Sequence, residues 1–380
     1  MRLYFKVFNF VFYMAMAVFT YYNLYFKSIG LSSSQIGTIN SLAKAVALLS
    51  LPLWGILSDY YRANKKLLMI TVAGSLASSL LFLVVESFWL IVLIMMFFLT
   101  FFLSTIPLAD AQLLGYLDKD SKQYGKYRIW GSIGYTAVVA VIGYFIEQTA
   151  PRNIFYLSAL IYLITLMIIP KLPKEDVSIE LGSLDKFKQL IQRGNLLLFI
   201  LFAFFISLTL ETNNVYFPLY VIDQGGKEFL VGIALTIAAT SEMAIFYFSE
   251  EIMARFKLKY IFLLSALAFS LRWFLLAQFP LKVVFLAAQL LHSLTFGLFH
   301  VTAVNYINEI CGKKFKATGQ NLYATTRGIS GIVGSFIGGF IYQELGGSIL
   351  YFYLSLIALI AGIVYFKVLQ KNDNVSYVGG

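Results

Sequence analysis

The stretch Ile349–Phe366 reads ILYFYLSLIALIAGIVYF, and its pattern decides the class of fold. It contains 18 residues and no charged side chain, which is typical of a helix that crosses a hydrocarbon core of about 30 Å. Strands of a membrane barrel would alternate apolar and polar residues, and neither this stretch nor Leu67–Val85 does so. The sequence therefore predicts an all-α membrane protein.

The composition of the whole chain agrees with this class. Of 380 residues, 59% are hydrophobic and only 13% are charged, against about 25% charged residues in soluble domains. The single cysteine, Cys311, allows no internal disulfide and no cysteine-based metal site. Met1–Phe26 lacks a small-residue cleavage site and is long enough to span, so we expect it to be the first helix and not a signal peptide.

Twelve apolar segments follow one another along the chain, and only one connection between them is long. That connection, Lys171–Arg193, is polar and charged and contains Pro173 and Gly182. We expect twelve transmembrane helices in two pseudo-symmetric six-helix bundles, at 1–170 and 195–368, with a cytoplasmic linker at 171–194 and a tail at 369–380. The expected spans are 5–26, 36–58, 67–85, 88–115, 128–147, 154–170, 195–222, 229–249, 260–279, 282–308, 317–342 and 348–368.

A weak internal repeat supports the two bundles. Ile142–Ile146, IGYFI, resembles Ile337–Ile341, IGGFI, which lies 195 positions later. Repeated halves of this kind place a solute site near the midplane between them.

The basic residues predict the orientation of the chain. If both termini and every second loop are cytoplasmic, that side holds 21 of the 29 Lys and Arg residues, the opposite side 4 and the spans 4. Basic loops stay in the cytoplasm, so we expect a multi-pass protein of a bacterial-type inner membrane with both termini cytoplasmic. The net charge of +10 then reflects topology, and we expect no binding of nucleic acid.

Nine ionisable side chains lie within the apolar spans or at their ends. A charge in hydrocarbon costs at least roughly 2.5–3.5 kcal/mol, so such groups pair with one another or face a cavity, and they mark the path of a solute or a proton. No further ligands converge on the histidines, so we expect no metal, and the chain has no phosphate-binding loop or hydrolase motif of an enzyme. The nine are Lys44, Asp110, Arg128, Glu211, Glu242, Arg272, His292, His300 and Arg327.

Three motifs carry a resemblance to a known family. Gly55–Lys66, GILSDYYRANKK, looks like the loop between helices two and three of the major facilitator superfamily. Pro107–Ala111, PLADA, and Tyr124–Gly134, YGKYRIWGSIG, resemble the phenylpropionate-permease group of that superfamily, which is related to lactose permease. The resemblance implies the major facilitator fold, transport by alternating access, and a conformational latch on the cytoplasmic face formed by Gly55, Asp59 and Arg62.

The likeness to lactose permease also implies roles for the buried charges. Asp110 and Arg128, 18 positions apart, match the acid and the arginine that bind the sugar. Arg272 and His292 match residues of proton coupling, and Glu211 with Arg327 matches an acid–base pair between helices seven and eleven. We assign Arg327 to the proton-coupling set together with Arg272 and His292.

One departure from lactose permease affects the proton. The carboxylate that carries the proton there lies three residues after the histidine, where this chain has Thr295. Our hypothesis is that Glu242 carries the proton instead, because a carboxyl without a nearby base in an apolar setting is suited to load and release one. The alternative is a structural carboxyl that is hydrogen-bonded to Ser or Thr neighbours.

Three further residues complete the expected solute site. Trp130 stacks on a ring of the solute or anchors the helix at the membrane surface. Asn214 lies three positions after Glu211 and shares its helix face. Lys44 binds the solute, or extends to the membrane surface if it lies near a helix end. Structural pairing is the competing interpretation for Asp110 with Arg128 and for Glu211 with Arg327.

The predicted function is proton-coupled symport of a small organic solute by a monomer in a lipid bilayer, with the proton gradient in place of a cofactor. Aromatic carboxylates such as phenylpropionate come first, as the resemblance to the phenylpropionate-permease group implies, and sugars or nucleosides come next. The slight excess of positive charge in the spans also favours an organic acid. The alternatives are an exporter of hydrophobic compounds in the same fold and a non-transporting membrane sensor. The central loop is too short for the output domain that a sensor needs.

Overall fold

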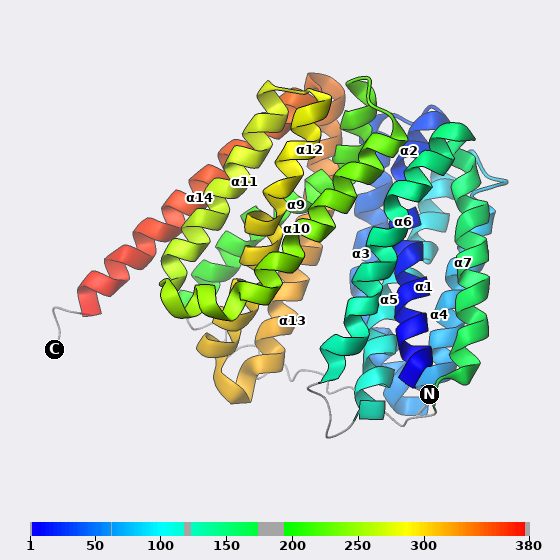
Figure 1. Cartoon of the computed structure of the whole chain (residues 1–380), viewed down its shortest axis with the longest axis horizontal. Coiled ribbons are helices and arrows are strands. Elements are labelled where there is room, and N and C mark those ends of the chain that lie inside the picture. Colours follow the sequence, from blue (N-terminus) through cyan, green and yellow to red (C-terminus); the bar gives the residue numbers. More distant parts are fainter. Residues whose placement is uncertain (1, 62, 118–122, 174–193, 377–380) are drawn as a thin grey trace. The chain divides into compact units, whose positions relative to one another are not determined.

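The computed structural model describes residues 2–61, 63–117, 123–173 and 194–376, and within them the chain is helical, without a strand. Each of the twelve expected spans coincides with helical structure (Figure 1), so the predicted all-α class is confirmed. The helices of the first half are α1 (Arg2–Phe19), α2 (Tyr22–Ser28), α3 (Ser33–Tyr61), α4 (Asn64–Leu81), α5 (Phe88–Leu117), α6 (Tyr124–Gln148) and α7 (Ile154–Ile168).

The second half contains one long helix with a break. Its elements are α9 (Gly194–Asp223), α10 (Glu228–Arg255), α11 (Leu258–Gln278), α12 (Lys282–Leu290), the π turn η4 (Ser293–Gly297), α13 (Leu298–Leu345) and α14 (Gly347–Ser376). The expected loop at 309–316 lies inside α13, where Gly312 takes φ +63° and interrupts the helical backbone. Glycine adopts this left-handed conformation at little cost, so the two expected spans meet at Gly312 without a long loop.

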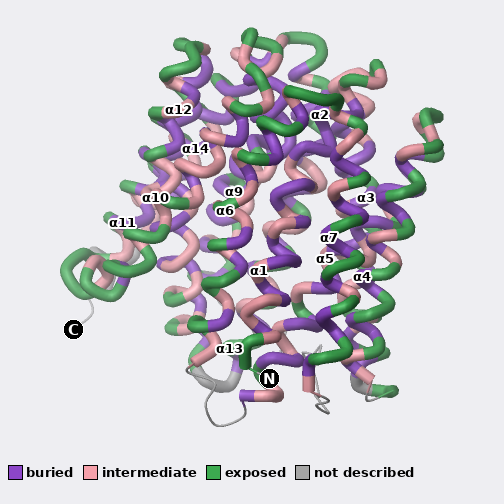
Figure 2. The backbone as a smooth tube through the Cα atoms, turned by 45° about the vertical axis from the view of Figure 1, so that its right-hand side comes forward, coloured by how far each residue is buried: buried purple, intermediate pink, exposed green. Residues whose placement is uncertain are grey.

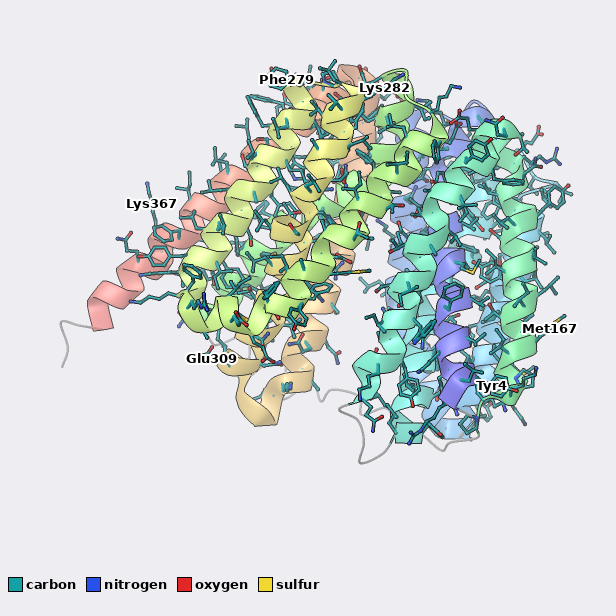
Figure 3. The ribbon with its side chains drawn as sticks, in the orientation of Figure 1. Tyr4, Met167, Phe279, Lys282, Glu309 and Lys367 are labelled. Carbon is teal, nitrogen blue, oxygen red and sulfur yellow. The ribbon has the colours of Figure 1, made fainter. Side chains whose placement is uncertain are left out.

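Ten helices among the described residues are long and apolar enough to cross a membrane. The two expected spans outside this set are α4, which begins with Asn64, Lys65 and Lys66, and the part of α13 that follows Gly312. Large apolar side chains lie on the outside of the helices; Met167, which is 69% exposed, projects from α7 (Figure 3). Figure 2 shows buried and exposed residues alternating along the helices, as expected for helices that pack on one face and meet hydrocarbon on the other.

The helices form two compact units. Unit 1 comprises the described residues of Met1–Leu181 together with Phe217–Thr236, and unit 2 comprises those of Gly182–Tyr216 and Ile237–Gly380. The boundary therefore crosses α9 and α10, whose connected ends belong to unit 1. The predicted division of the chain into bundles at 1–170 and 195–368 stays a prediction.

Aromatic side chains form the core of unit 1. Tyr22 lies 5.0 Å from Phe155 and 5.2 Å from Phe98 between ring centroids, and all three are buried. The Tyr22 hydroxyl pairs with Ser158 at 3.0 Å, so its polar end is satisfied inside the core. These contacts join α2, α5 and α7, while α1 packs on α6 and α7.

The core of unit 2 joins α9, α11 and α14. Phe202 stacks on Tyr365 with ring centroids 4.3 Å apart and meets Phe262 edge-on at 5.8 Å. A Cβ on Gly362 would collide with the Cβ of Ala266, so only glycine allows α14 to approach α11 this closely. Small residues at such contacts are typical of helices packed in membranes.

A hairpin formed by Phe217–Thr236 is tied to the other helices of unit 1 by charge. Lys27 of α2 pairs with Asp223, and Lys227 pairs with Glu147 of α6 at 3.1 Å. All four side chains are partly exposed to solvent, so each pair contributes at most about 1 kcal/mol.

Close backbone contact holds the same hairpin more firmly than the charges do. A Cβ on Gly232 would lie 2.6 Å from Cα of Ala140, and one on Gly143 would collide with the carbonyl oxygen of Glu228. The fully buried Tyr21 lies beside both glycines and donates a hydrogen bond to the Val139 carbonyl at 2.7 Å. Larger residues at either glycine would separate the hairpin from α6.

Candidate functional site

The first polar cluster lies in unit 1 and joins α1, α5 and α6. Asp110 accepts a hydrogen bond from the Tyr124 hydroxyl and interacts electrostatically with Arg128. The Arg128 guanidinium lies over the ring of Tyr13, 4.2 Å from its centroid, a cation–π contact. The predicted partners Asp110 and Arg128 thus lie close enough to interact electrostatically; together with Tyr13 and Tyr124 we call them the Asp110 cluster.

Local sequence explains how this cluster forms. Pro107 lies inside α5 one turn before Asp110, and proline removes one hydrogen bond of the helix. On α6, a Cβ at Gly131 would lie 2.7 Å from the Tyr13 ring, so glycine makes room for that ring beside Arg128. Sequence reasoning missed Tyr13, because the chain contains 25 tyrosines and nothing in the sequence marks this one.

Trp130 and Lys44 were also predicted to bind the solute. Trp130 contacts Phe10 and Lys6, with its ring 5.8 Å from the Lys6 ammonium. It follows Arg128 by two residues, about 200° around the helix, so it faces away from the side of Arg128. Lys44 is half-buried in α3.

The second polar cluster lies in unit 2 around Arg272 of α11, which is 1% exposed. Its Nη1 donates hydrogen bonds to Nδ1 of His292 at 2.9 Å and to Oγ1 of Thr295 at 3.1 Å, and its Nη2 donates to Oε1 of Gln289. On the other side of the imidazole, Nε2 of His292 lies 3.4 Å from Oε2 of Glu242 on α10. The predicted residues Glu242, Arg272 and His292 therefore meet; with Gln289 and Thr295 they form the Arg272 cluster.

The hydrogen bonds of this cluster determine the tautomer of His292. Arginine only donates, so Nδ1 of His292 must accept and the ring proton lies on Nε2. That proton points at Glu242. His292 could take a second proton only by losing its hydrogen bond to Arg272, whereas Glu242 could take one without breaking it.

The helix geometry around His292 departs from the expected regular span. Ser293–Gly297 form a π turn, and a π turn inside a helix often lies at a functional site. Thr295, which stands where a proton-carrying carboxylate was expected, lies in this turn and accepts the hydrogen bond from Arg272. A Cβ at Gly297 would lie 3.3 Å from the Cβ of Glu242, so glycine lets α10 come close.

A third polar contact joins α9 to α13. Nη2 of Arg327 lies 3.4 Å from Oε1 of Glu211, so the predicted acid–base pair forms, with both side chains partly exposed. Asn214, predicted to act with Glu211, is exposed. Its neighbour Asn213 is buried and accepts a hydrogen bond from Tyr351 at 3.0 Å, a contact that the sequence did not indicate.

The predicted latch can be described only in part. Gly55 is buried in α3, whereas Arg62 and the side chain of Asp59 lie outside the described residues. The latch therefore stays a prediction.

Next to it lies a buried network of amides that was not predicted. Asn64 donates to Oε1 of Gln112 at 2.8 Å and to the Leu108 carbonyl at 2.9 Å. Gln112 in turn donates to the Pro173 carbonyl at 2.6 Å.

Comparison with known proteins gives a consistent family. Residues 3–354 match the model of the MFS_1 like family. The chain is 27% identical to the uncharacterized transporter YwbF of Bacillus subtilis (strain 168), over 90% of this chain and 87% of that protein. It is 25% identical to the maltose permease of Geobacillus stearothermophilus, over 91% and 88% of the two chains. The probable 3-phenylpropionic acid transporter of Escherichia coli (strain K12) is 24% identical, over 71% and 72%.

Solved structures show the same fold. The nucleoside transporter NupG superposes with a TM-score of 0.85 at 16% identity, over 97% of this chain and 99% of that one. The xylose transporter XylE from E. coli, in an inward-open conformation, gives a TM-score of 0.70 at 15% identity, over 96% and 95%. At these identities the likeness concerns the fold alone.

Proposed function

Since this chain belongs to the MFS_1 like family and is a membrane transporter rather than an enzyme, we propose that it is a proton-coupled symporter of a small polyhydroxyl solute. The solute binds at the Asp110 cluster and the proton at Glu242, and transport follows alternating access in an inner membrane with both termini cytoplasmic. The observation that carries this proposal is the hydrogen bond from Arg272 to Nδ1 of His292 at 2.9 Å.

That hydrogen bond supports Glu242 as the proton carrier for a chemical reason. It keeps the single ring proton of His292 on Nε2, facing the Glu242 carboxylate at 3.4 Å. A charged Glu242 attracts this N–H across 3.4 Å, and a protonated Glu242 attracts it less, so the protonation of Glu242 acts on His292. The Thr295 hydroxyl accepts a hydrogen bond from Arg272, and a threonine takes no proton at physiological pH.

The Asp110 cluster favours a neutral solute. Arg128 already has the opposite charge of Asp110 in its field, so an incoming carboxylate would meet a compensated arginine and a repelling acid. Sugar hydroxyls instead can donate to Asp110 and accept from Arg128. The relative named maltose permease agrees with this order.

Aromatic carboxylates are the second candidate. Arg128 supplies the positive charge that a carboxylate needs, and the half-buried Tyr124 in the same cluster supplies an aromatic ring. The relative named as a probable 3-phenylpropionic acid transporter favours the same class.

The test is counterflow by the purified protein in liposomes, with maltose, a nucleoside and phenylpropionate as probes, with and without a pH gradient. We expect counterflow of the sugar, accumulation driven by the gradient, and loss of both in Asp110→Asn. Trp130→Phe is the control. Trp130 lies two residues after Arg128 on α6 but faces away from it, so this variant should keep wild-type transport. Extrusion of a hydrophobic dye without counterflow of any probe would favour the exporter.

The second part of the test concerns the proton. In Glu242→Gln we expect counterflow to persist, because binding and alternation remain, and gradient-driven accumulation to be lost. A Glu242→Gln protein that still concentrates its solute in response to a pH gradient would exclude Glu242 as the carrier.

A further inference from the structure

Four aromatic rings form a continuous column in unit 2. His292 stacks on Phe296 with centroids 5.5 Å apart, Phe296 stacks on His300 at 5.2 Å, and His300 stacks on Tyr323 at 6.0 Å. The planes within these pairs differ by 18°, 9° and 25°. Phe296 therefore lies between two imidazoles, one on each face.

The π turn explains why three residues spaced by four share one line. In a regular α-helix each step of four residues drifts by about 40°, so His292 and His300 would lie about 80° apart. The π turn Ser293–Gly297 contains more residues per turn and reduces this drift. Phe296 lies inside the turn, so the stack depends on this local geometry.

Each end of the column meets a different charged group. His292 contacts Arg272 of α11 and Glu242 of α10. His300 interacts electrostatically with Arg327. Its Nδ1 lies 3.5 Å from the Tyr323 hydroxyl. The Arg327 guanidinium also lies 5.7 Å from the centroid of Phe296. Phe296 thus contacts His292, His300 and Arg327.

We propose that Phe296 is a positioning residue that couples the proton site at Glu242 to the Glu211–Arg327 ion pair. The inference rests on the proposed function, because it takes Glu242 as the proton carrier. When Glu242 takes a proton, the attraction at Nε2 of His292 weakens, and the ring, still hydrogen-bonded to Arg272, shifts away from Glu242. Phe296 is clamped between the two imidazoles, so that movement changes its contact with Arg327 and, through Arg327, with Glu211.

Such coupling is reciprocal. If the proton on Glu242 alters the Glu211–Arg327 pair, removing the charge of Glu211 must in turn alter the proton affinity of Glu242. Typical coupling changes an affinity about 5- to 150-fold. We expect about tenfold here, which is about one pH unit, and we expect the effect to depend on the ring at position 296.

Trp273 gives a readout that needs no solute. It is fully buried and lies 4.8 Å from the Arg272 guanidinium, so its fluorescence reports on the Arg272 cluster. In a full-length chain with Trp54, Trp89 and Trp130 replaced by Phe, Trp273 fluorescence is followed against pH. Glu211→Gln should shift the midpoint by about one pH unit with Phe296 present and by less than about a third of that with Phe296→Leu.

Matched variants separate positioning from simple loss of structure. Phe296→Met keeps the volume but removes the flat ring and should behave as Phe296→Leu, whereas Phe296→Tyr should restore the shift. Phe336→Leu, at a ring that is 44% exposed on α13, should leave the shift at its wild-type value.

The outcomes distinguish the two proposals. A Trp273 signal that does not titrate, or that titrates unchanged in Glu242→Gln, contradicts the proton site and the inference together. If the signal depends on Glu242 but Glu211→Gln shifts its midpoint equally with Phe, Leu or Met at position 296, the role of Phe296 is overturned and the proposed function stands.

Discussion

Replacing Gly143 by alanine should loosen the hairpin at Phe217–Thr236 from α6. The added methyl would collide with the Glu228 carbonyl and lie 2.7 Å from the Tyr21 hydroxyl. Overpacking of this kind costs about 1–3 kcal/mol, and disturbing the hydrogen bond from Tyr21 to Val139 costs about 0.5–1.5 kcal/mol more. Alanine gains about 1 kcal/mol in helix propensity, so the net loss is about 0.5–3.5 kcal/mol.

The assay is thermal unfolding of the purified protein in detergent, with Gly125→Ala as the matched control. Gly125 lies on the same helix, and a Cβ there would have no heavy atom within 4 Å. The control should therefore melt at or slightly above the wild-type temperature, and Gly143→Ala should melt several degrees lower. Equal melting temperatures for the two variants would refute the close contact between α6 and the hairpin.

Two further predictions concern charge and buried amides. Lys27→Glu should lower the unfolding free energy by at most about 1 kcal/mol, because both members of the Lys27–Asp223 pair are about one-third exposed. The double variant Lys27→Glu with Asp223→Lys should recover this loss. A double variant that is no more stable than Lys27→Glu alone would contradict the pair. Gln112→Leu removes one of the hydrogen bonds of Asn64 and the donor to the Pro173 carbonyl, and should cost about 1–3 kcal/mol. Gln148→Leu, at an exposed position at the end of α6, is the control, and equal denaturant midpoints for the two variants would contradict the network.

The fold could be predicted from the sequence because its signal is long and redundant. Each span repeats the same apolar pattern for about 20 residues, and basic residues mark one side, so an error in one segment leaves the others readable. The resemblance to lactose permease implied the Glu211–Arg327 pair and placed Arg272 and His292 in one proton-coupling set, and the structure brings the members of each set into contact.

The remaining contacts depend on helix rotation and ring packing, which the sequence does not display. Asn213 and Asn214 are adjacent, and a rotation of about 100° decides which one is buried. Tyr13 and Phe296 belong to a chain with 25 tyrosines and 36 phenylalanines. The π turn that aligns Phe296 with two histidines follows from packing against α11 and has no sequence mark of its own.

The position of the hairpin has a consequence for split versions of the chain. A cut in the central linker is the natural choice for producing two halves from separate genes. It would leave the first fragment without Phe217–Thr236, so that Gly143, Tyr21, Lys27 and Glu147 lose the residues that they contact in this hairpin. Neither fragment is then a self-contained folding module, and activity should return only when both are made together in one cell.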